Sequence, residues 1–103
     1  CRVIDLFSIK PIDAELLEKA ARETGGIVTC EEHNIFGGFG SAVAEVVSER
    51  YPVPVQRIGA QDMFGESCRD KEVSKLLEKH GITSFNIAKT LKEIRSKISW
   101  RYF

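Results

Sequence analysis

The residues best suited to chemistry gather in one short stretch, Cys30-Glu31-Glu32-His33. A carboxylate beside an imidazole can act as an acid/base pair, and Cys30 with His33 has the C-x-x-H spacing of two metal ligands. Side chains alternate along a strand, so only one of the two glutamates can share a face with His33 if the strand continues that far. A structural zinc site needs four ligands, and no second pair follows. We therefore interpret Cys30 as an inert core residue of a strand.

A glycine-rich turn, Gly37-Gly38-Phe39-Gly40, follows where phosphate-binding loops occur, between a strand and a helix. Its spacing matches neither the dinucleotide fingerprint nor the P-loop, and the two preceding carboxylates would repel a phosphate. We favour a sharp turn with close helix–sheet packing. The alternative is a loop that contacts a neighbouring domain, because open α/β sheets place ligands at the carboxyl ends of their strands. Its residues would be Glu32, His33, Gly37, Gly38 and Gly40.

The other candidate residues are isolated in the sequence. His80 closes a predicted helix, where an imidazolium interacts favourably with the helix C-terminus. Cys68 lies in a loop, and neither it nor Cys1 and Cys30 have an imidazole partner in the sequence, so nucleophilic catalysis is disfavoured. The C-terminal tail is rich in aromatic residues: Trp100, Tyr102 and Phe103. We interpret these residues either as ordinary packing or as a contact with a partner chain. We assign no catalytic, cofactor-binding or metal-binding residue.

Three apolar runs and four amphipathic stretches must position these residues. We expect strands at residues 3–7, 27–31 and 53–58, and the nearly unbroken apolar character of the second is typical of a parallel sheet. Helices are expected at residues 14–24, from about 41 to 50, around 73–80, and from a cap at Thr83 to Ile98. This order predicts right-handed crossovers and a three-layer α/β/α fold with a small, mainly parallel sheet.

The first helix has the clearest boundaries. Asp13 is suited to its N-cap, Ile12 and Leu17 to a hydrophobic staple, and the pair Gly25-Gly26 to its C-terminal stop. The later helices carry apolar stripes that should face the sheet. Those stripes are Val43, Val46 and Val47, and then Ile87, Leu91, Ile94 and Ile98.

Length and composition limit the class of protein. The chain has 103 residues, the size of one domain, and 15 basic against 15 acidic residues, which disfavours binding to nucleic acid. No apolar run reaches the roughly 20 residues of a membrane span, and no signal peptide is recognisable. Three widely spaced cysteines predict a reduced, cytoplasmic protein. Because the sheet is small and the chain starts at Cys1 inside a predicted strand, we expect an upstream strand–helix unit to be missing.

Several of these stretches, in this order, resemble the transketolase C-terminal domain. The resemblance rests on residues 3–13, on residues 27–33, on the turn and helix start at residues 37–43, and on Phe64-Gly65-Glu66-Ser67. The helix pair around Leu76-Leu77 and Gly81 also fits, so the similarity covers roughly residues 2–95. It is most like the C-terminal subunit of a split transketolase. Deoxyxylulose-phosphate synthase is the near neighbour, but residues 9–13 and 64–67 favour transketolase.

The resemblance implies a thiamine-diphosphate enzyme that moves two-carbon ketol units between sugar phosphates, as in the pentose phosphate pathway. In that family the diphosphate–Mg²⁺ site lies in the preceding domains, so thiamine diphosphate and magnesium would belong to the parent enzyme. The implied partners are upstream thiamine-binding domains or an N-terminal subunit, in a homodimer or heterotetramer. The chain itself would support the structure and be inactive alone.

Two departures from the family pattern concern one loop. Met63 stands where the pattern has Arg, and Cys68 stands where it has Gly. If the backbone at Cys68 needs a positive φ, the side chain would cost roughly 1 kcal/mol.

Two readings outside the transketolase family stay open: a stand-alone binding module that uses Glu32, His33 and Gly38, and an assembly unit that pairs through an open sheet edge or the aromatic tail.

Overall fold

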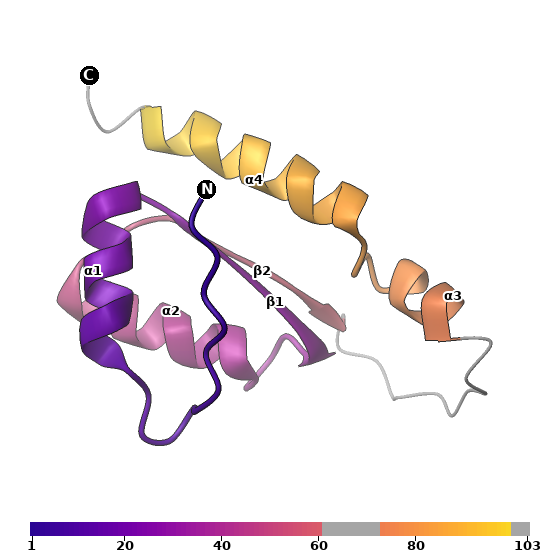
Figure 1. Ribbon diagram of the computed structural model, residues 1–103, viewed down its shortest axis with the longest axis horizontal. Coiled ribbons are helices and arrows are strands. Elements are labelled where there is room, and N and C mark those ends of the chain that lie inside the picture. The colour runs from indigo at the N-terminus through magenta and orange to yellow at the C-terminus, as the bar shows by residue number, and fades with distance from the viewer. Residues whose placement is uncertain (61–72, 100–103) are drawn as a thin grey trace.

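The computed structural model describes residues 1–60 and 73–99, which contain two strands and four helices. In chain order these are α1 (Ala14–Thr24), β1 (Ile27–Asn34), α2 (Phe39–Arg50), β2 (Val55–Ala60), α3 (Val73–Lys79) and α4 (Ser84–Ser99). Figure 1 shows α4 along one face of the strand pair, with α1 and α2 along the other. The small parallel α/β architecture predicted from the sequence is confirmed in this part of the chain.

The two strands are parallel and in close register. Ile27 lies opposite Val55 and Cys30 opposite Ile58, after which the register shifts before Asn34 meets Ala60. A crossover through a helix is the usual way to join parallel neighbours, and α2 makes it here. The irregularity before Asn34 marks the point where β1 leaves the regular ladder and approaches the glycine-rich turn.

The core lies between the strands and the pair α1–α2. Leu17, Ala21, Val43 and Val47 form one buried cluster, and the valines are the largest side chains that are completely buried among the described residues. Ala20 and Ala21 let α1 approach closely because they have almost no side chain. Both valines come from the stripe predicted to face inward.

The predicted caps of α1 are present. Asp13 Oδ1 accepts a hydrogen bond from the Leu16 amide at 3.1 Å, and Gly25 ends the helix at φ 81°. Ile12 packs against the cluster that contains Leu17, as a staple requires. A side chain that accepts one of the free first-turn N–H groups is worth about 1 kcal/mol.

The other boundaries differ from the prediction by a few residues. β1 continues to Asn34, α2 begins at Phe39 instead of about residue 41, and β2 occupies residues 55–60 instead of 53–58. The start of the last helix was predicted correctly, since Thr83 Oγ1 accepts from the Asn86 amide at 3.1 Å. Strand ends were placed too early because the polar Glu32 and the glycine at position 59 resemble loop residues.

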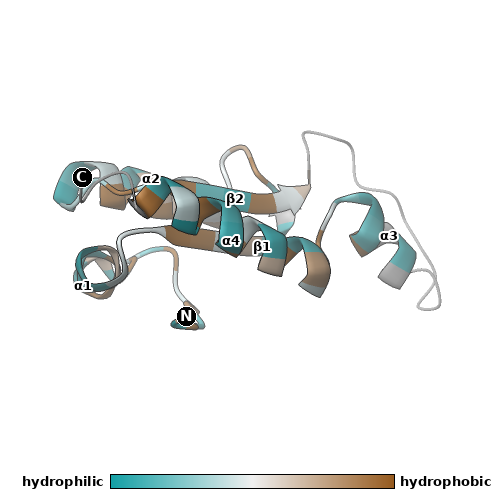
Figure 2. Cartoon of the chain, turned by 90° about the horizontal axis from the view of Figure 1, so that it is seen from above, coloured by the Kyte–Doolittle hydropathy of each residue, from teal (hydrophilic) through white to brown (hydrophobic). Residues whose placement is uncertain are grey.

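The predicted first strand at residues 3–7 is wrong. The sheet of the described residues has two strands, and residues 1–8 lie outside it. Figure 2 shows the N-terminal segment on the side of β1 away from β2. An apolar run forms a strand only where a neighbour offers backbone partners, and here a gap separates the segment from β1. Val3 is 90% exposed as a result.

Some predicted features lie outside the described residues. They are the loop around Phe64 and Cys68, including its departures from the family pattern, and the tail of Trp100, Tyr102 and Phe103. Within the described helices, none is long and apolar enough to cross a membrane.

Candidate functional site

The centre of the candidate site is the carboxylate of Glu31, which caps a helix that follows it in sequence. Glu31 Oε1 accepts from the Phe39 amide at 2.9 Å, and Oε2 accepts from the Gly40 amide at 2.6 Å. These amides belong to the first turn of α2, where N–H groups lack helical partners and the helix dipole favours negative charge. The carboxylate therefore supplies the cap that Gly38, at the N-cap position, cannot provide.

Two glycines make this approach possible. A Cβ at Gly40 would lie 2.5 Å from Thr29 Oγ1 and 2.9 Å from Arg57 Cγ, closer than atoms pack. A Cβ at Gly38 would meet the Asn34 carbonyl at 2.6 Å and the Glu31 carboxylate as well. The predicted role of the turn, close helix–sheet packing, is confirmed at both glycines.

Arg57 ties the loop after β1 to the second strand. Its Nη1 donates to the Ile35 carbonyl at 2.7 Å and to Ser41 Oγ at 2.9 Å. Ser41 Oγ in turn donates to the Ile35 carbonyl at 2.9 Å, and the Gly37 amide donates to Ser41 at 3.2 Å. The polar groups of the backbone and of the side chains thus hydrogen-bond to one another, and this network holds the loop in one conformation.

The tip of this loop carries an exposed aromatic ring. Phe36 is 59% exposed, and its ring centroid lies 5.9 Å from the Arg57 guanidinium carbon. The Phe36 amide donates to Asn34 Oδ1 at 2.9 Å, which is the geometry of an Asx turn. A large apolar side chain on a well-fixed loop is typical of a contact with another protein surface.

This arrangement can cap the start of α2 and can contact another protein surface through Phe36, but it does not suit binding of a phosphate. The first-turn amides already hold an anion, the Glu31 carboxylate, and its negative charge opposes a second one. The described residues therefore do not fit thiamine diphosphate at the glycine-rich turn. Among those residues, no group of three metal-ligating side chains could hold a magnesium or zinc ion.

The structure separates the predicted cluster Cys30-Glu31-Glu32-His33. Glu31 faces α2, whereas Glu32 is exposed on β1. His33 belongs to β1, but its side chain lies outside what the structure describes. Gly37 sits at φ 75° in the turn with open space around it. Of the predicted loop residues, Gly38 and Gly40 therefore come together with Glu31.

The interpretation of Cys30 as a core residue is wrong. Its side chain is exposed, on the face of β1 opposite to that of Glu31, which points toward α2. Partial burial raises the pKa of the Cys30 thiol, and the neighbouring Glu31 and Glu32 carboxylates raise it further. A raised pKa keeps the thiol protonated near neutral pH, which makes it a weak nucleophile.

Sequence reasoning missed the partners that fix the loop: Asn34, Phe36, Ser41 and Arg57. A signal existed for Arg57, since this charged residue lies within the strand predicted at residues 53–58. A charged residue there must find partners, because burial of an unpaired charge is costly. Asn34 is a frequent turn former. Phe36 and Ser41 carry no comparable signal.

Two buried polar atoms lack a hydrogen-bond partner within the described residues. One is Thr29 Oγ1, on a side chain that is only 4% exposed, and the other is His80 Nδ1. Thr29 lies beneath Gly40, where the helix approaches the strand closely. His80 follows α3 as predicted, but its Nδ1 makes no bond to the helix end within the described part of the chain.

A comparison with protein families decides the classification. The family model for the transketolase C-terminal domain matches residues 1–87 of the chain. The chain belongs to the transketolase C-terminal domain family. An apulose-4-phosphate transketolase subunit of Phocaeicola vulgatus is 44% identical over 96 residues, covering 93% of this chain and 30% of that protein.

Further relatives include a second transketolase subunit and a related synthase. The 6-deoxy-6-sulfo-D-fructose transketolase subunit of Clostridium sp. (strain MSTE9) is 36% identical over 99 residues, covering 96% of this chain and 30% of that protein. The 1-deoxy-D-xylulose-5-phosphate synthase of Heliobacterium modesticaldum is 43% identical over 104 residues, covering 96% of this chain and 16% of that protein.

A solved structure supports the same family by fold. It is a split-gene transketolase described as an inactive β4 tetramer, with a TM-score of 0.81 and 50% sequence identity, covering 90% of this chain and 29% of that one. The chain thus spans at most about 30% of the length of these relatives.

Proposed function

We propose that the chain is the C-terminal part of a thiamine-diphosphate-dependent transketolase, one domain that supports the enzyme without supplying reacting groups. The enzyme would transfer two-carbon ketol units between sugar phosphates, with thiamine diphosphate and magnesium held by other domains. Its partners would be upstream thiamine-binding domains or an N-terminal subunit, in a homodimer or heterotetramer. A cytoplasmic role in carbohydrate metabolism, as in the pentose phosphate pathway, is part of the same proposal.

The observation that carries the proposal is the Glu31 cap. In a domain that bound the cofactor diphosphate, the free amides at the start of α2 would be the natural place for it. Here the Phe39 and Gly40 amides are bonded to a carboxylate of the chain itself. The chemistry of a thiamine enzyme resides in its cofactor, which a protein must bind and orient. We therefore assign binding and orientation to the rest of the enzyme.

Reconstitution tests this function. The purified 103-residue chain is assayed for ketol transfer alone, and then with the thiamine-binding subunit or domains of the same enzyme. We expect no turnover by the chain alone and measurable turnover after mixing or covalent fusion. Turnover of a ketose phosphate by the chain alone would contradict the proposal, as would a reconstituted enzyme that has full activity without this chain.

The C-terminal part of a deoxyxylulose-phosphate synthase is the second candidate, and the 43% identity to the Heliobacterium enzyme favours it. Substrate pairs separate the two activities. The reconstituted enzyme is supplied either with two sugar phosphates or with pyruvate and a triose phosphate. Ketol transfer between the sugars supports transketolase, whereas release of carbon dioxide from pyruvate supports the synthase.

We further propose that the end of β1 and the loop after it contact a neighbouring domain. The contact residues would be Glu32, His33, Gly37, Gly38 and Gly40, with Phe36 as the apolar anchor, because Arg57 and Asn34 hold that exposed ring in place. The variant Phe36→Ser should weaken association with the partner by about tenfold or more. Phe85→Ser is the matched control, since Phe85 is even more exposed at 79% but lies on α4. Equal affinities of the two variants would contradict the contact.

A stand-alone binding module would use the same loop for a small ligand or protein. It predicts a folded monomer whose ligand-induced chemical shifts gather around Glu32 and Gly38. Shifts confined to other residues would exclude this module.

A further inference from the structure

The turn between β1 and α2 carries an exposed ring on a backbone that has little stiffness of its own. Three of the seven residues from Asn34 to Gly40 are glycines, and glycine loses more conformational freedom on ordering than any other residue. Phe36 lies in this stretch and is 59% exposed, so burial does not fix its position. Because a fixed conformation costs conformational entropy at every residue, side-chain contacts must supply the order of this turn.

Arg57, on the neighbouring strand β2, supplies such a contact. The regular pairing of β1 with β2 shifts after Cys30, and the last pair joins Asn34 to Ala60. The Ile35 amide still donates to the Ala60 carbonyl at 2.9 Å, whereas the Ile35 carbonyl accepts from Arg57 Nη1 at 2.7 Å. Figure 1 shows both strands ending beside this turn. The guanidinium thus adds one side-chain bond to the ladder at the point where the backbone of β1 leaves it.

The same nitrogen links the turn to the start of α2. Arg57 Nη1 donates to Ser41 Oγ at 2.9 Å. Ser41 in turn donates to the Ile35 carbonyl and accepts from the Gly37 amide. The guanidinium carbon lies 5.9 Å from the centroid of the Phe36 ring, within the range of a cation–π contact. One side chain therefore contacts the backbone before the ring, the helix after it and the ring itself.

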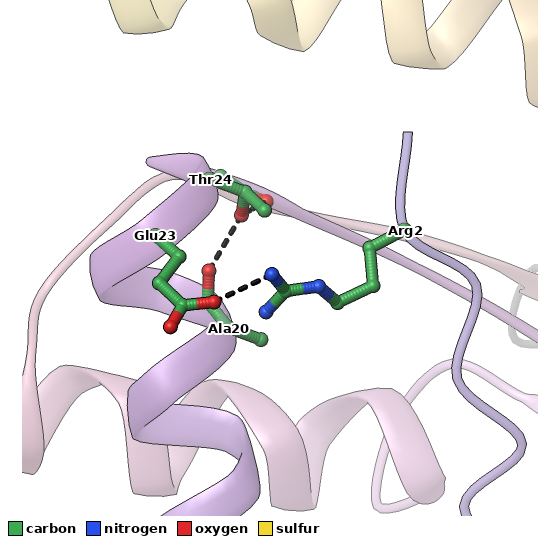
Figure 3. Close-up of polar contacts among 5 residues, drawn as sticks. Arg2, Ala20, Glu23 and Thr24 are labelled. Atoms are coloured by element: carbon green, nitrogen blue, oxygen red, sulfur yellow. Dashed lines mark hydrogen bonds and ion pairs between the residues drawn. The ribbon is translucent and has the colours of Figure 1, made fainter.

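A second arginine of the chain holds a segment by a weaker contact. Figure 3 shows Arg2 reaching across to Glu23 of α1, and both side chains of that ion pair are exposed. Exposed ion pairs contribute little because water competes for both charges. Arg57 instead donates to a carbonyl and to a hydroxyl at part-buried positions, where water competes less. Arg57 is therefore the better suited of the two to hold one conformation.

We propose that Arg57 is a positioning residue for association with the rest of the enzyme: it holds the turn between β1 and α2 in the conformation in which Phe36 docks, and it does not itself contact the partner. The inference rests on the proposed function, because the partner is the thiamine-binding part of the transketolase. It adds a residue of β2 to a contact that otherwise consists of the end of β1 and the loop after it. A turn that is ordered before association binds more tightly, since less conformational entropy is lost on binding.

Two other roles for Arg57 make different predictions. An arginine that bonded directly to the partner would contribute to affinity whether or not Phe36 is present. An arginine needed only for the fold would stabilise the whole domain. Among the described residues, however, its side-chain hydrogen bonds go to the turn and to the start of α2. A local effect on the turn is therefore expected.

A double-mutant cycle in the reconstituted enzyme tests the inference. Arg57→Met keeps the aliphatic stem, which passes close to Gly40, and removes the charge and every donor. We expect it to weaken association with the thiamine-binding part about tenfold in calorimetric titration, but less than about twofold when combined with Phe36→Ser. Equal weakening with and without Phe36→Ser would overturn the inference, and so would an unchanged affinity of Arg57→Met alone.

Two further variants sharpen this titration. Arg57→Lys keeps the charge and one flexible donor group, so it should restore part of the affinity that Arg57→Met loses. Gln56→Met is the matched control, because Gln56 is the preceding residue of β2 and its side chain is exposed. A loss in Gln56→Met equal to that in Arg57→Met would overturn the inference, since it would show a general effect of changes in β2.

Amide hydrogen exchange in the 103-residue chain separates the order of the turn from the stability of the fold. The amides of Phe36 and Gly37 should exchange about tenfold or more faster in Arg57→Met. The Ile27 amide, which donates to the Pro54 carbonyl within the strand pair, should keep its rate. Equal acceleration at all three amides would show that Arg57 supports the whole fold and would overturn the inference, as would unchanged rates at Phe36 and Gly37.

The outcomes also separate this inference from the proposed function. An enzyme that associates as predicted but performs no ketol transfer would remove the proposed function and leave Arg57 a positioning residue. Weaker association in Phe36→Ser but not in Arg57→Met would leave the contact intact and remove the inference.

Discussion

The two sides of β1 differ in how completely they are built. On the α2 side, Glu31 and two glycines bring helix and strand together through bonds of 2.6 and 2.9 Å. On the α4 side an apolar slot separates the strand edge from the N-terminal segment. Apolar side chains on the α2 side thus belong to a closed core, whereas apolar side chains on the α4 side line an open slot.

The difference teaches that hydrophobic periodicity predicts which residues face inward, but does not tell what they face. Val47 and Leu91 both follow helical stripes, yet Val47 is buried and Leu91 is half-buried. A close contact needs a specific partner, such as the carboxylate that bonds the start of α2. Variants on the closed side and on the open side should therefore behave differently.

The largest effect is expected at Gly38. The variant Gly38→Ala places a Cβ against the Asn34 carbonyl and the Glu31 carboxylate, so either the cap or the turn must move. We expect a loss of about 3 kcal/mol in the free energy of unfolding, measured by urea denaturation. Gly37→Ala is the control, since its Cβ meets nothing and only the positive φ costs about 1 kcal/mol. Equal losses would show that close packing at Gly38 is unimportant.

Truncation on the two helices should give a smaller contrast. Val47→Ala empties a fully buried position and should cost about 2 kcal/mol. Leu91→Ala removes more carbon atoms but from a half-buried position at the slot, so we expect less than about 1 kcal/mol in the isolated chain. Equal costs in the isolated chain would argue against an open slot.

Removal of the charge at the cap comes next. Glu31→Gln keeps the shape of the side chain, but its single oxygen can accept from only one of the Phe39 and Gly40 amides, and its NH2 group faces the other amide as a second donor. We expect a loss of about 1.5 kcal/mol by thermal or chemical denaturation. Glu32→Gln, one residue away and exposed, should leave stability unchanged. A similar loss in both variants would indicate a general charge effect.

The smallest effect concerns the anchor of the N-terminal segment. The hydrogen bond from Arg2 lowers the pKa of the Glu23 carboxyl, so the contact stabilises the folded chain above the ordinary pKa of Glu23. That stabilisation disappears as pH falls through the lowered value. Arg2→Gln should return the pKa of Glu23 toward its ordinary range, as followed by NMR titration. Lys19→Gln, a weaker influence, should shift the pKa less; an equal shift would contradict the anchor.

The sequence predicted the local features of the fold well. The caps at Asp13 and Thr83 and the inward valines of α2 depend on neighbours within a few positions, so short patterns reveal them. Residues 3–7 and Cys30 were misassigned because their environment depends on whether a strand lies beside β1. That pairing is non-local, and composition alone carries no information about it.

The candidate site was predicted in part. Close packing at Gly38 and Gly40 followed from their place before a helix. The bonds of Glu31 to α2 and of Arg57 to the loop were missed, because they join residues that are 8 to 22 positions apart. Such contacts depend on the register of β1 against α2 and β2.

Calorimetric titration with thiamine diphosphate and Mg²⁺ tests the central claim most directly. We expect no binding to the 103-residue chain and stoichiometric binding to the complete enzyme, because the first-turn amides of α2 are bonded to Glu31 and the cofactor site lies elsewhere. Micromolar binding of the cofactor by the 103-residue chain alone would contradict the account.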